Sequence, residues 1–110
     1  MKTQEIIDEL QFCAAQCNHC YDACQLEKEK DQLQQCMMND MDCAEICRLT
    51  AQILDRESEN ADLFLRLCVE MCERCAAECD KHAHMAHCEA CAKACRKCAE
   101  MCRDYHTEQA

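Results

Sequence analysis

Sulfur chemistry dominates this sequence. Cysteine accounts for 16 of the 110 residues, and most cysteines recur at alternating spacings of three and four, the stripe that one face of an α-helix presents. Leucine normally occupies such a stripe, so the sequence predicts an interior column of soft metal ligands. The candidate ligands are Cys13, Cys17, Cys20, Cys24, Cys36, Cys43, Cys47, Cys68, Cys72, Cys75, Cys79, Cys88, Cys91, Cys95, Cys98 and Cys102.

Thiolates select Cu(I), Zn(II) or iron–sulfur clusters, and the spacing helps to separate these. Cysteines four apart on a helix can share a two-coordinate metal such as Cu(I) after small rotamer changes, and bridging sulfurs would extend this into an array. A bacterial ferredoxin run would contain Cys-Pro, and the chain has no proline. Zinc ribbons are disfavoured because the rhythm does not stop at a turn, but four cysteines at one level would suit tetrahedral zinc.

Composition points to helices alone. Glycine and proline are absent, which removes the preferred residues of tight turns and β-hairpins, whereas good helix formers are abundant. Leucine, isoleucine, valine and phenylalanine together number only 15. Buried thiols must therefore supply part of the core, and we expect an all-α protein.

The charge and the N-terminus restrict the partners. The formal net charge is −10 without a basic stripe, so we expect no nucleic-acid partner. The first ten residues lack the apolar run of a signal peptide, and we expect no membrane span. The expected location is the cytoplasm, where thiols stay reduced. Helical neighbours also hold their Cβ atoms ~5–6 Å apart, against ~3.5–4.5 Å in a disulfide, which disfavours a disulfide framework.

Polar clusters mark the expected helix ends. The first cluster spans residues 27–31. Its last residue, Asp31, is predicted to form a capping box with Gln34. The second spans 55–60, with Ser58 or Asn60 as N-cap, and a weaker one spans 81–87. The predicted helices cover about 3–28, 31–56, 59–82 and 85–106. Short connections between similar helices predict an antiparallel up-down-up-down four-helix bundle with a cysteine-lined core, built as one domain over residues 1–110.

The register of this bundle aligns the cysteines in levels. Three levels each take one cysteine from every helix: Cys24, Cys36, Cys79 and Cys88; Cys17, Cys43, Cys72 and Cys95; and Cys13, Cys47, Cys68 and Cys98. A fourth level contains Cys20, Cys75 and Cys91, with Asp40 or Asn39 filling the gap on the second helix. We expect Asp40 to be a solvated helix residue, with a metal ligand as the alternative.

The two ends of the bundle are expected to differ. One end gathers an apolar plug of Ile6, Ile7, Leu10, Ile53, Leu54, Leu63 and Leu65. The other gathers His82, His84 and His87, with Met85, beside the level of Cys24 and Cys88. These histidines are interpreted either as ligands that relay metal into the axis or as solvated polar residues of a turn.

Four stretches together resemble the four-helix-bundle copper storage proteins of bacteria, and specifically their cytosolic branch. They are Cys17-Asn-His-Cys20, Cys43-Ala-Glu-Ile-Cys47, residues 78–84 and residues 91–102. The resemblance covers nearly the whole chain. It implies a homotetramer of bundles, each of which holds many Cu(I) ions on its sixteen cysteines. The second helix departs from the stripe at Asn39 and Asp40.

The leading hypothesis is therefore reversible cytosolic sequestration of several Cu(I) ions by cysteine thiolates, which protects against copper toxicity. Copper ions, and a cytosolic copper donor or acceptor, are the expected partners. We expect storage and not catalysis, because no nucleophile–base pair or substrate pocket is evident. The alternatives are a zinc or cadmium thiolate buffer and a thiol redox protein.

Overall fold

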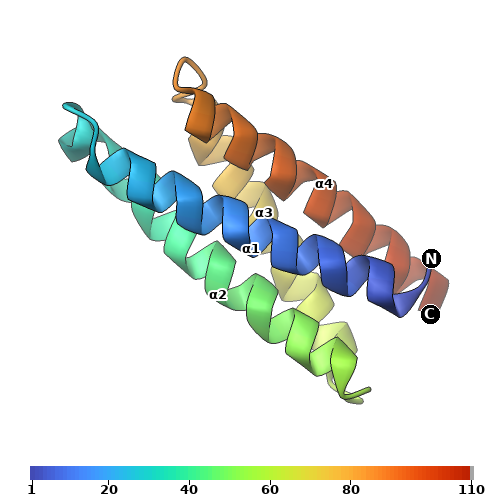
Figure 1. The fold of residues 1–110 in the computed structure, drawn as a ribbon. Coiled ribbons are helices and arrows are strands. Elements are labelled where there is room, and N and C mark those ends of the chain that lie inside the picture. Colours follow the sequence, from blue (N-terminus) through green and yellow to red (C-terminus); the bar gives the residue numbers. More distant parts are fainter. Residues whose placement is uncertain (110) are drawn as a thin grey trace.

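The computed structural model describes residues 1–109 as a four-helix bundle of 44 × 19 × 18 Å (Figure 1). Each helix packs on its two neighbours in a closed ring, so the first helix also contacts the last. Both termini and the α2–α3 turn lie at one end, and the other two turns lie at the opposite end. The elements are α1 (Thr3–Gln25), the 3₁₀ helix η1 (Lys30–Leu33), α2 (Gln34–Asp55), α3 (Ala61–Asp80) and α4 (Ala86–Gln109).

The predicted fold class and its cysteine-lined core are confirmed, and the lining starts above an apolar plug. Ile6 and Leu10 have no exposed area at the terminal end, and Leu54 and Leu65 are buried beside them. Leu63 was also expected in the plug but is 56% exposed. It lies two positions before the buried Leu65, and residues two apart on a helix do not share a face. Within the part of the chain described, no helix combines the length and apolar content of a membrane span.

Helix α1 is shorter than expected. It ends at Gln25, and the amide of Leu26 donates to the oxygen of Ala23 at 3.1 Å, which tightens the last turn. Cys24 is the last residue of its buried stripe, and the next turn of the helix would offer charged residues to the core. Without further apolar burial, the helix gains little by continuing.

The start of α2 also differs from the expectation. Residues 30–33 form η1, and α2 begins at Gln34 with Leu33 in the N-cap position and no side-chain cap. The predicted capping box of Asp31 and Gln34 is therefore wrong. Instead, Gln34 Nε2 donates to the oxygen of Lys30 at 3.0 Å. Leu33 has no exposed area, so burying its side chain accounts for the tighter turn that precedes the helix.

Helices α3 and α4 are shifted relative to the prediction. Helix α3 starts at Ala61, after Asn60 in the N-cap position, and α4 runs beyond residue 106 to Gln109. Long-range contacts hold its last turns: Tyr105 and Thr3 share a hydroxyl–hydroxyl hydrogen bond of 2.7 Å. The N-terminal ammonium group also pairs with Glu108 at 2.9 Å.

The α2–α3 turn contains a residue in the left-handed backbone region, and this residue is not glycine. Glu57 has a φ of 53°, its amide donates to the oxygen of Leu54, and the amide of Ser58 donates to the oxygen of Ile53, both at 3.1 Å. These two bonds define a Schellman motif, in which glycine usually takes the left-handed position. Glu57 therefore carries backbone strain that glycine would relieve.

Replacing Glu57 with glycine should stabilise the reduced, metal-free protein. We expect the free energy of unfolding to rise by about 0.5–1 kcal/mol, since the steric penalty of the left-handed region exceeds the entropic cost of glycine. Urea denaturation followed by circular dichroism measures this change. Glu57→Ala is the control, because it removes the same charge but keeps the Cβ atom. Equal stabilities of the two variants would contradict the assignment of strain to this position.

Candidate metal centre

The interior of the bundle is a column of free thiols. All sixteen cysteines have no exposed area, and none forms a disulfide. On α1 and α3 they follow the 3-4 alternation without interruption from Cys13 to Cys24 and from Cys68 to Cys79, so every turn within these two stretches directs sulfur to the axis. Buried protonated thiols behave as small apolar groups, which lets the column serve as a core in the absence of metal.

The sulfur atoms are spaced for metal coordination. Inter-helix Sγ–Sγ distances are 3.7 Å for Cys36–Cys79, Cys43–Cys72, Cys47–Cys68 and Cys17–Cys95. Neighbours four apart on one helix, such as Cys43 and Cys47, lie 3.9 Å apart. With metal–sulfur bonds of about 2.3 Å, these separations correspond to S–metal–S angles of roughly 105–120°. Trigonal and tetrahedral coordination would therefore require little movement of the thiols.

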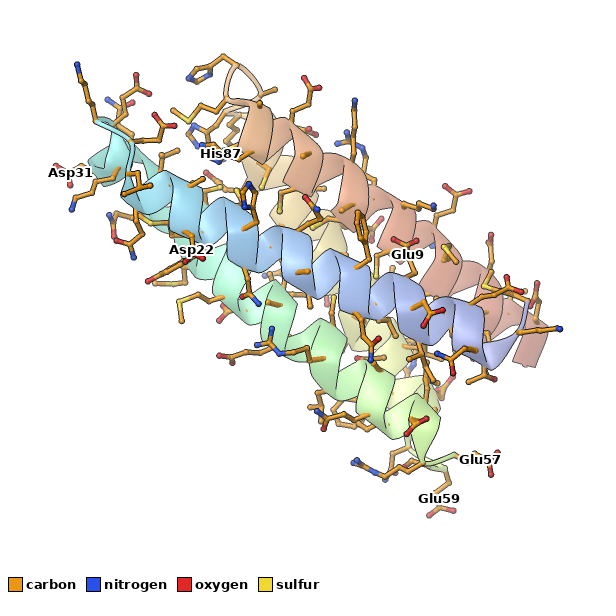
Figure 2. All side chains as sticks on the ribbon, in the orientation of Figure 1. Glu9, Asp22, Asp31, Glu57, Glu59 and His87 are labelled. Carbon is orange, nitrogen blue, oxygen red and sulfur yellow. The ribbon has the colours of Figure 1, made fainter. Side chains whose placement is uncertain are left out.

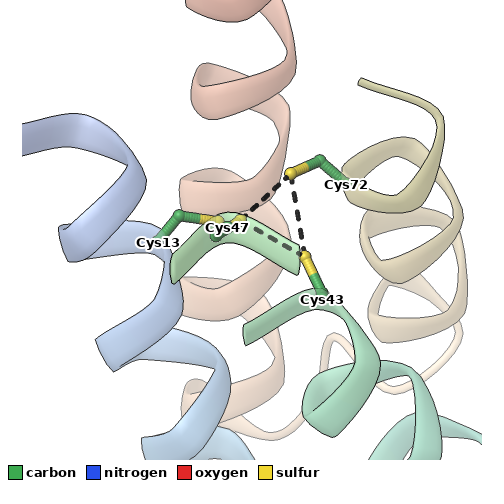
Figure 3. Close-up of side chains that lie close together, drawn as sticks. All are labelled: Cys13, Cys43, Cys47 and Cys72. Atoms are coloured by element: carbon green, nitrogen blue, oxygen red, sulfur yellow. Dashed lines mark hydrogen bonds between the residues drawn. The ribbon is translucent and has the colours of Figure 1, made fainter. Parts of the chain in front are cut away.

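The sulfurs interlock instead of forming flat levels. Cys13, Cys43, Cys47 and Cys72 place their sulfurs within 4.8 Å of one another (Figure 3), although the register assigned them to two different levels. Cys13 and Cys43 also belong to a second such group with Cys17 and Cys95. Side chains lean toward the N-terminus of their own helix, so antiparallel neighbours lean in opposite directions and interleave. Shared sulfurs favour bridging between metal ions over isolated sites.

Asp40 continues the stripe of α2 and is fully buried, so the expectation of a solvated side chain is wrong. It follows Cys36 by four and precedes Cys43 by three, which is the position a cysteine would take. Its Oδ1 atom lies 3.3 Å from Cys91 Sγ and 3.4 Å from Cys75 Sγ. Burial, with the nearby thiols, raises the pKa of Asp40 to about 11, so the metal-free protein holds this carboxyl protonated at neutral pH.

Burial also favours the protonated form of two thiols near the histidine end, those of Cys24 and Cys88. Desolvation is the main cause that raises the pKa of Cys24 to about 12, and it raises that of Cys88 as well. Among the described residues, no lysine or arginine is buried, so no fixed cation stabilises thiolates inside the column. A metal cation would supply the missing positive charge.

The histidines lie at the end of the bundle expected from the sequence, but they differ in their contacts. His87 Nδ1 lies 3.5 Å from Cys88 Sγ, 3.6 Å from Cys20 Sγ and 3.9 Å from Cys24 Sγ. His82 contacts Glu78 at 3.3 Å, and the 65%-exposed His84 lies 3.8 Å from Glu29. Figure 2 labels His87 at this end of the bundle. The structure thus brings His87 to the sulfurs and pairs His82 and His84 with acidic side chains.

One residue at this end was missed by sequence reasoning. Glu27 Oε1 lies 3.1 Å from His87 Nε2, on the side of the ring away from the sulfurs. The predicted polar cluster included Glu27 only as a helix breaker. The antiparallel register of α1 and α4, extended one turn past the pair Cys24 and Cys88, would have placed it beside the histidines.

Known proteins are similar to this chain in both sequence and architecture. The family model described as copper storage protein matches residues 1–107. An uncharacterized cysteine-rich protein of Bacillus subtilis, YhjQ, is 43% identical over 91 residues, which is 83% of each chain.

Solved structures agree. A cytosolic copper storage protein from Streptomyces lividans, loaded with five coppers, superposes with a TM-score of 0.92 at 36% identity over 96% of this chain and 92% of its own. The Cu(I)-bound copper storage protein BsCsp3 gives a TM-score of 0.89 at 38% identity, over 94% of this chain and 97% of its own. Because this family model matches residues 1–107, this chain belongs to the copper storage protein family.

Proposed function

We propose that this protein reversibly stores several Cu(I) ions in the cytosol on the thiolates of its core, and so protects against copper toxicity. The observation that supports this proposal is the column of sixteen buried, unpaired cysteines, whose sulfur atoms lie close enough to one another to share metal ions. The Streptomyces lividans relative is cytosolic and takes up copper, and it has also been loaded with 10 copper equivalents.

Charge favours Cu(I) over zinc or cadmium as the stored ion. Equal numbers of monovalent copper ions and thiolates form a neutral array, whereas a closed site of one zinc and four thiolates keeps two negative charges. Buried uncompensated charge is costly, and no basic side chain is buried in the described residues to offset it. Sulfurs shared between neighbouring groups of four also suit bridging Cu(I) better than separate tetrahedral zinc sites.

We assign the ligand roles as follows. All sixteen cysteines bind copper, and His87 binds it where the column meets the histidine end, since its Nδ1 faces three sulfurs. His82 and His84 lie outside the sulfur column and serve as transient ligands during exchange with a cytosolic copper donor or acceptor. Copper displaces the thiol protons as it binds, and it stabilises the fold by mass action.

The proposal also covers assembly and the lack of catalysis. The bundle is one storage domain, and we assign it to a homotetramer, as the resemblance implies. Leu49 on α2, and Leu63 and Leu67 on α3, are exposed, and contact with a partner bundle would cover apolar side chains of this kind. We assign no enzymatic role. A thiol redox protein is disfavoured because the interlocked thiols offer many equivalent neighbours instead of one solvent-accessible reactive pair.

Titration of the reduced, metal-free protein with Cu(I) against bathocuproine disulfonate tests the stored ion and the capacity. We expect between about eight ions per chain, if each binds two unshared thiolates, and about sixteen, if the sulfurs bridge. Parallel titration with zinc is the control. Saturation at one to four Cu(I) per chain with tighter retention of zinc would contradict copper storage and favour the zinc buffer.

The buried carboxyl of Asp40 should make the metal-free fold dependent on pH. Its pKa is raised on folding, so it costs stability increasingly as the pH rises above about 4, where the unfolded carboxyl ionises. We expect Asp40→Asn to match the wild type at pH 4.5 and to exceed it by on the order of 2–4 kcal/mol at pH 7.5, in urea unfolding of the reduced protein. Asp42→Asn, on the exposed face of the same helix, should show a much smaller change between the two pH values. A pH-independent difference for Asp40→Asn would contradict the neutral buried carboxyl.

A further inference from the structure

The imidazole of His87 lies between a group of cysteine sulfurs and a carboxylate. On one side its Nδ1 faces Cys20, Cys24 and Cys88 at 3.5–3.9 Å. On the other side its Nε2 lies 3.1 Å from Glu27 Oε1, a residue of the α1–η1 connection that is 60 positions away in sequence. The His87 side chain is only 12% exposed, and that of Glu27 is 37% exposed. The ring is therefore held between the turn that follows α1 and the first turn of α4.

The contact with Glu27 decides which nitrogen of His87 can bind metal. A neutral imidazole carries one N–H group, and a carboxylate accepts hydrogen bonds but cannot donate them. Nε2 therefore carries the hydrogen and donates it to Glu27, which leaves the lone pair of Nδ1 directed at the three sulfurs. Carboxylates commonly orient metal-binding histidines in this way and raise their basicity.

The geometry points to Glu27 as a positioning residue for copper uptake, which is an inference that rests on the proposed function. Glu27 fixes the tautomer and the ring orientation of His87, so that Nδ1 receives Cu(I) at the histidine end and passes it to Cys20, Cys24 and Cys88. Because it does not face the column itself, Glu27 sets the rate of loading and leaves the capacity unchanged.

A second acidic residue provides a matched comparison. Glu29 lies in the same connection and pairs with His84 at 3.8 Å, but both side chains are more than half exposed and His84 makes no sulfur contact among those the structure describes. Glu27 and Glu29 therefore contribute the same charge to the same end of the bundle. Only Glu27 is connected to the sulfurs through a histidine.

Stopped-flow transfer of Cu(I) from a chelator complex to the reduced protein tests this role. Glu27→Ala should load about tenfold more slowly, since removing the hydrogen-bond partner of a ligating histidine typically lowers metal affinity or activity by about 10–100-fold. Glu27→Gln, whose amide oxygen also accepts a hydrogen bond, should recover much of the rate. Glu27→Lys, which can only donate, should be the slowest. Glu29→Ala should stay within about twofold of the wild type, because its 3.8 Å contact between two exposed side chains does not hold the ring of His84 in one orientation.

Two further measurements separate positioning from a merely structural role. In ¹⁵N NMR spectra of the metal-free protein, His87 Nδ1 should be unprotonated in the wild type and Glu27→Gln, and should gain the hydrogen in Glu27→Lys. On a His87→Ala background, Glu27→Ala should slow loading no further.

The outcomes also distinguish this inference from the proposed function. Failure of the wild-type protein to take up more than four Cu(I) would overturn storage itself. Normal uptake by the wild type, with Glu27→Ala and Glu29→Ala loading equally fast, would overturn the role of Glu27 alone.

Discussion

The structure depends on burying sixteen thiols along one axis without a fixed counter-ion. Protonated, these groups pack as a weakly apolar core; ionised, they would repel one another in a low-dielectric interior. Desolvation therefore favours the neutral form of these thiols until a cation arrives. Burial raises the pKa of Cys24 and Cys88 and so opposes empty thiolates, whereas copper binding removes both the protons and the charge problem. Metal binding therefore also stabilises the core.

Regular helices make this arrangement possible. Sulfurs meet at 3.7–4.0 Å because the cysteine stripe keeps its phase over about three to four turns of each helix and because the side chains of antiparallel neighbours lean in opposite directions and interleave. The chain has no glycine or proline to interrupt the helices, and it accepts strain at Glu57 to reverse direction. The apolar plug around Leu10 closes one end, which leaves the histidine end beside Cys24 and Cys88 as the approach to the column.

The fold class and the lining of the core could be predicted because cysteine carried the helical period so clearly. Other features could not. Asp40 continues the spacing of Cys36 and Cys43, but carboxyl groups are seldom fully buried without a charged partner, so only the packed structure shows its burial. The end of α1 at Gln25 and the 3₁₀ turn at Leu33 depend on tertiary packing, which local propensity does not encode. The contact of Glu27 with His87 joins residues 60 positions apart, and a single sequence gives no side-chain orientation at such a distance.

The central claim is that Cu(I) occupies the shaft between the helices, bridged by sulfurs from several of them. Anomalous diffraction at the copper absorption edge, from crystals of the reduced protein loaded with Cu(I), tests it most directly. The account predicts a row of copper peaks along the bundle axis, each within bonding distance of at least two cysteine sulfurs and with some sulfurs shared between peaks. Copper confined to the outer surface, with the axis empty of metal, would contradict it.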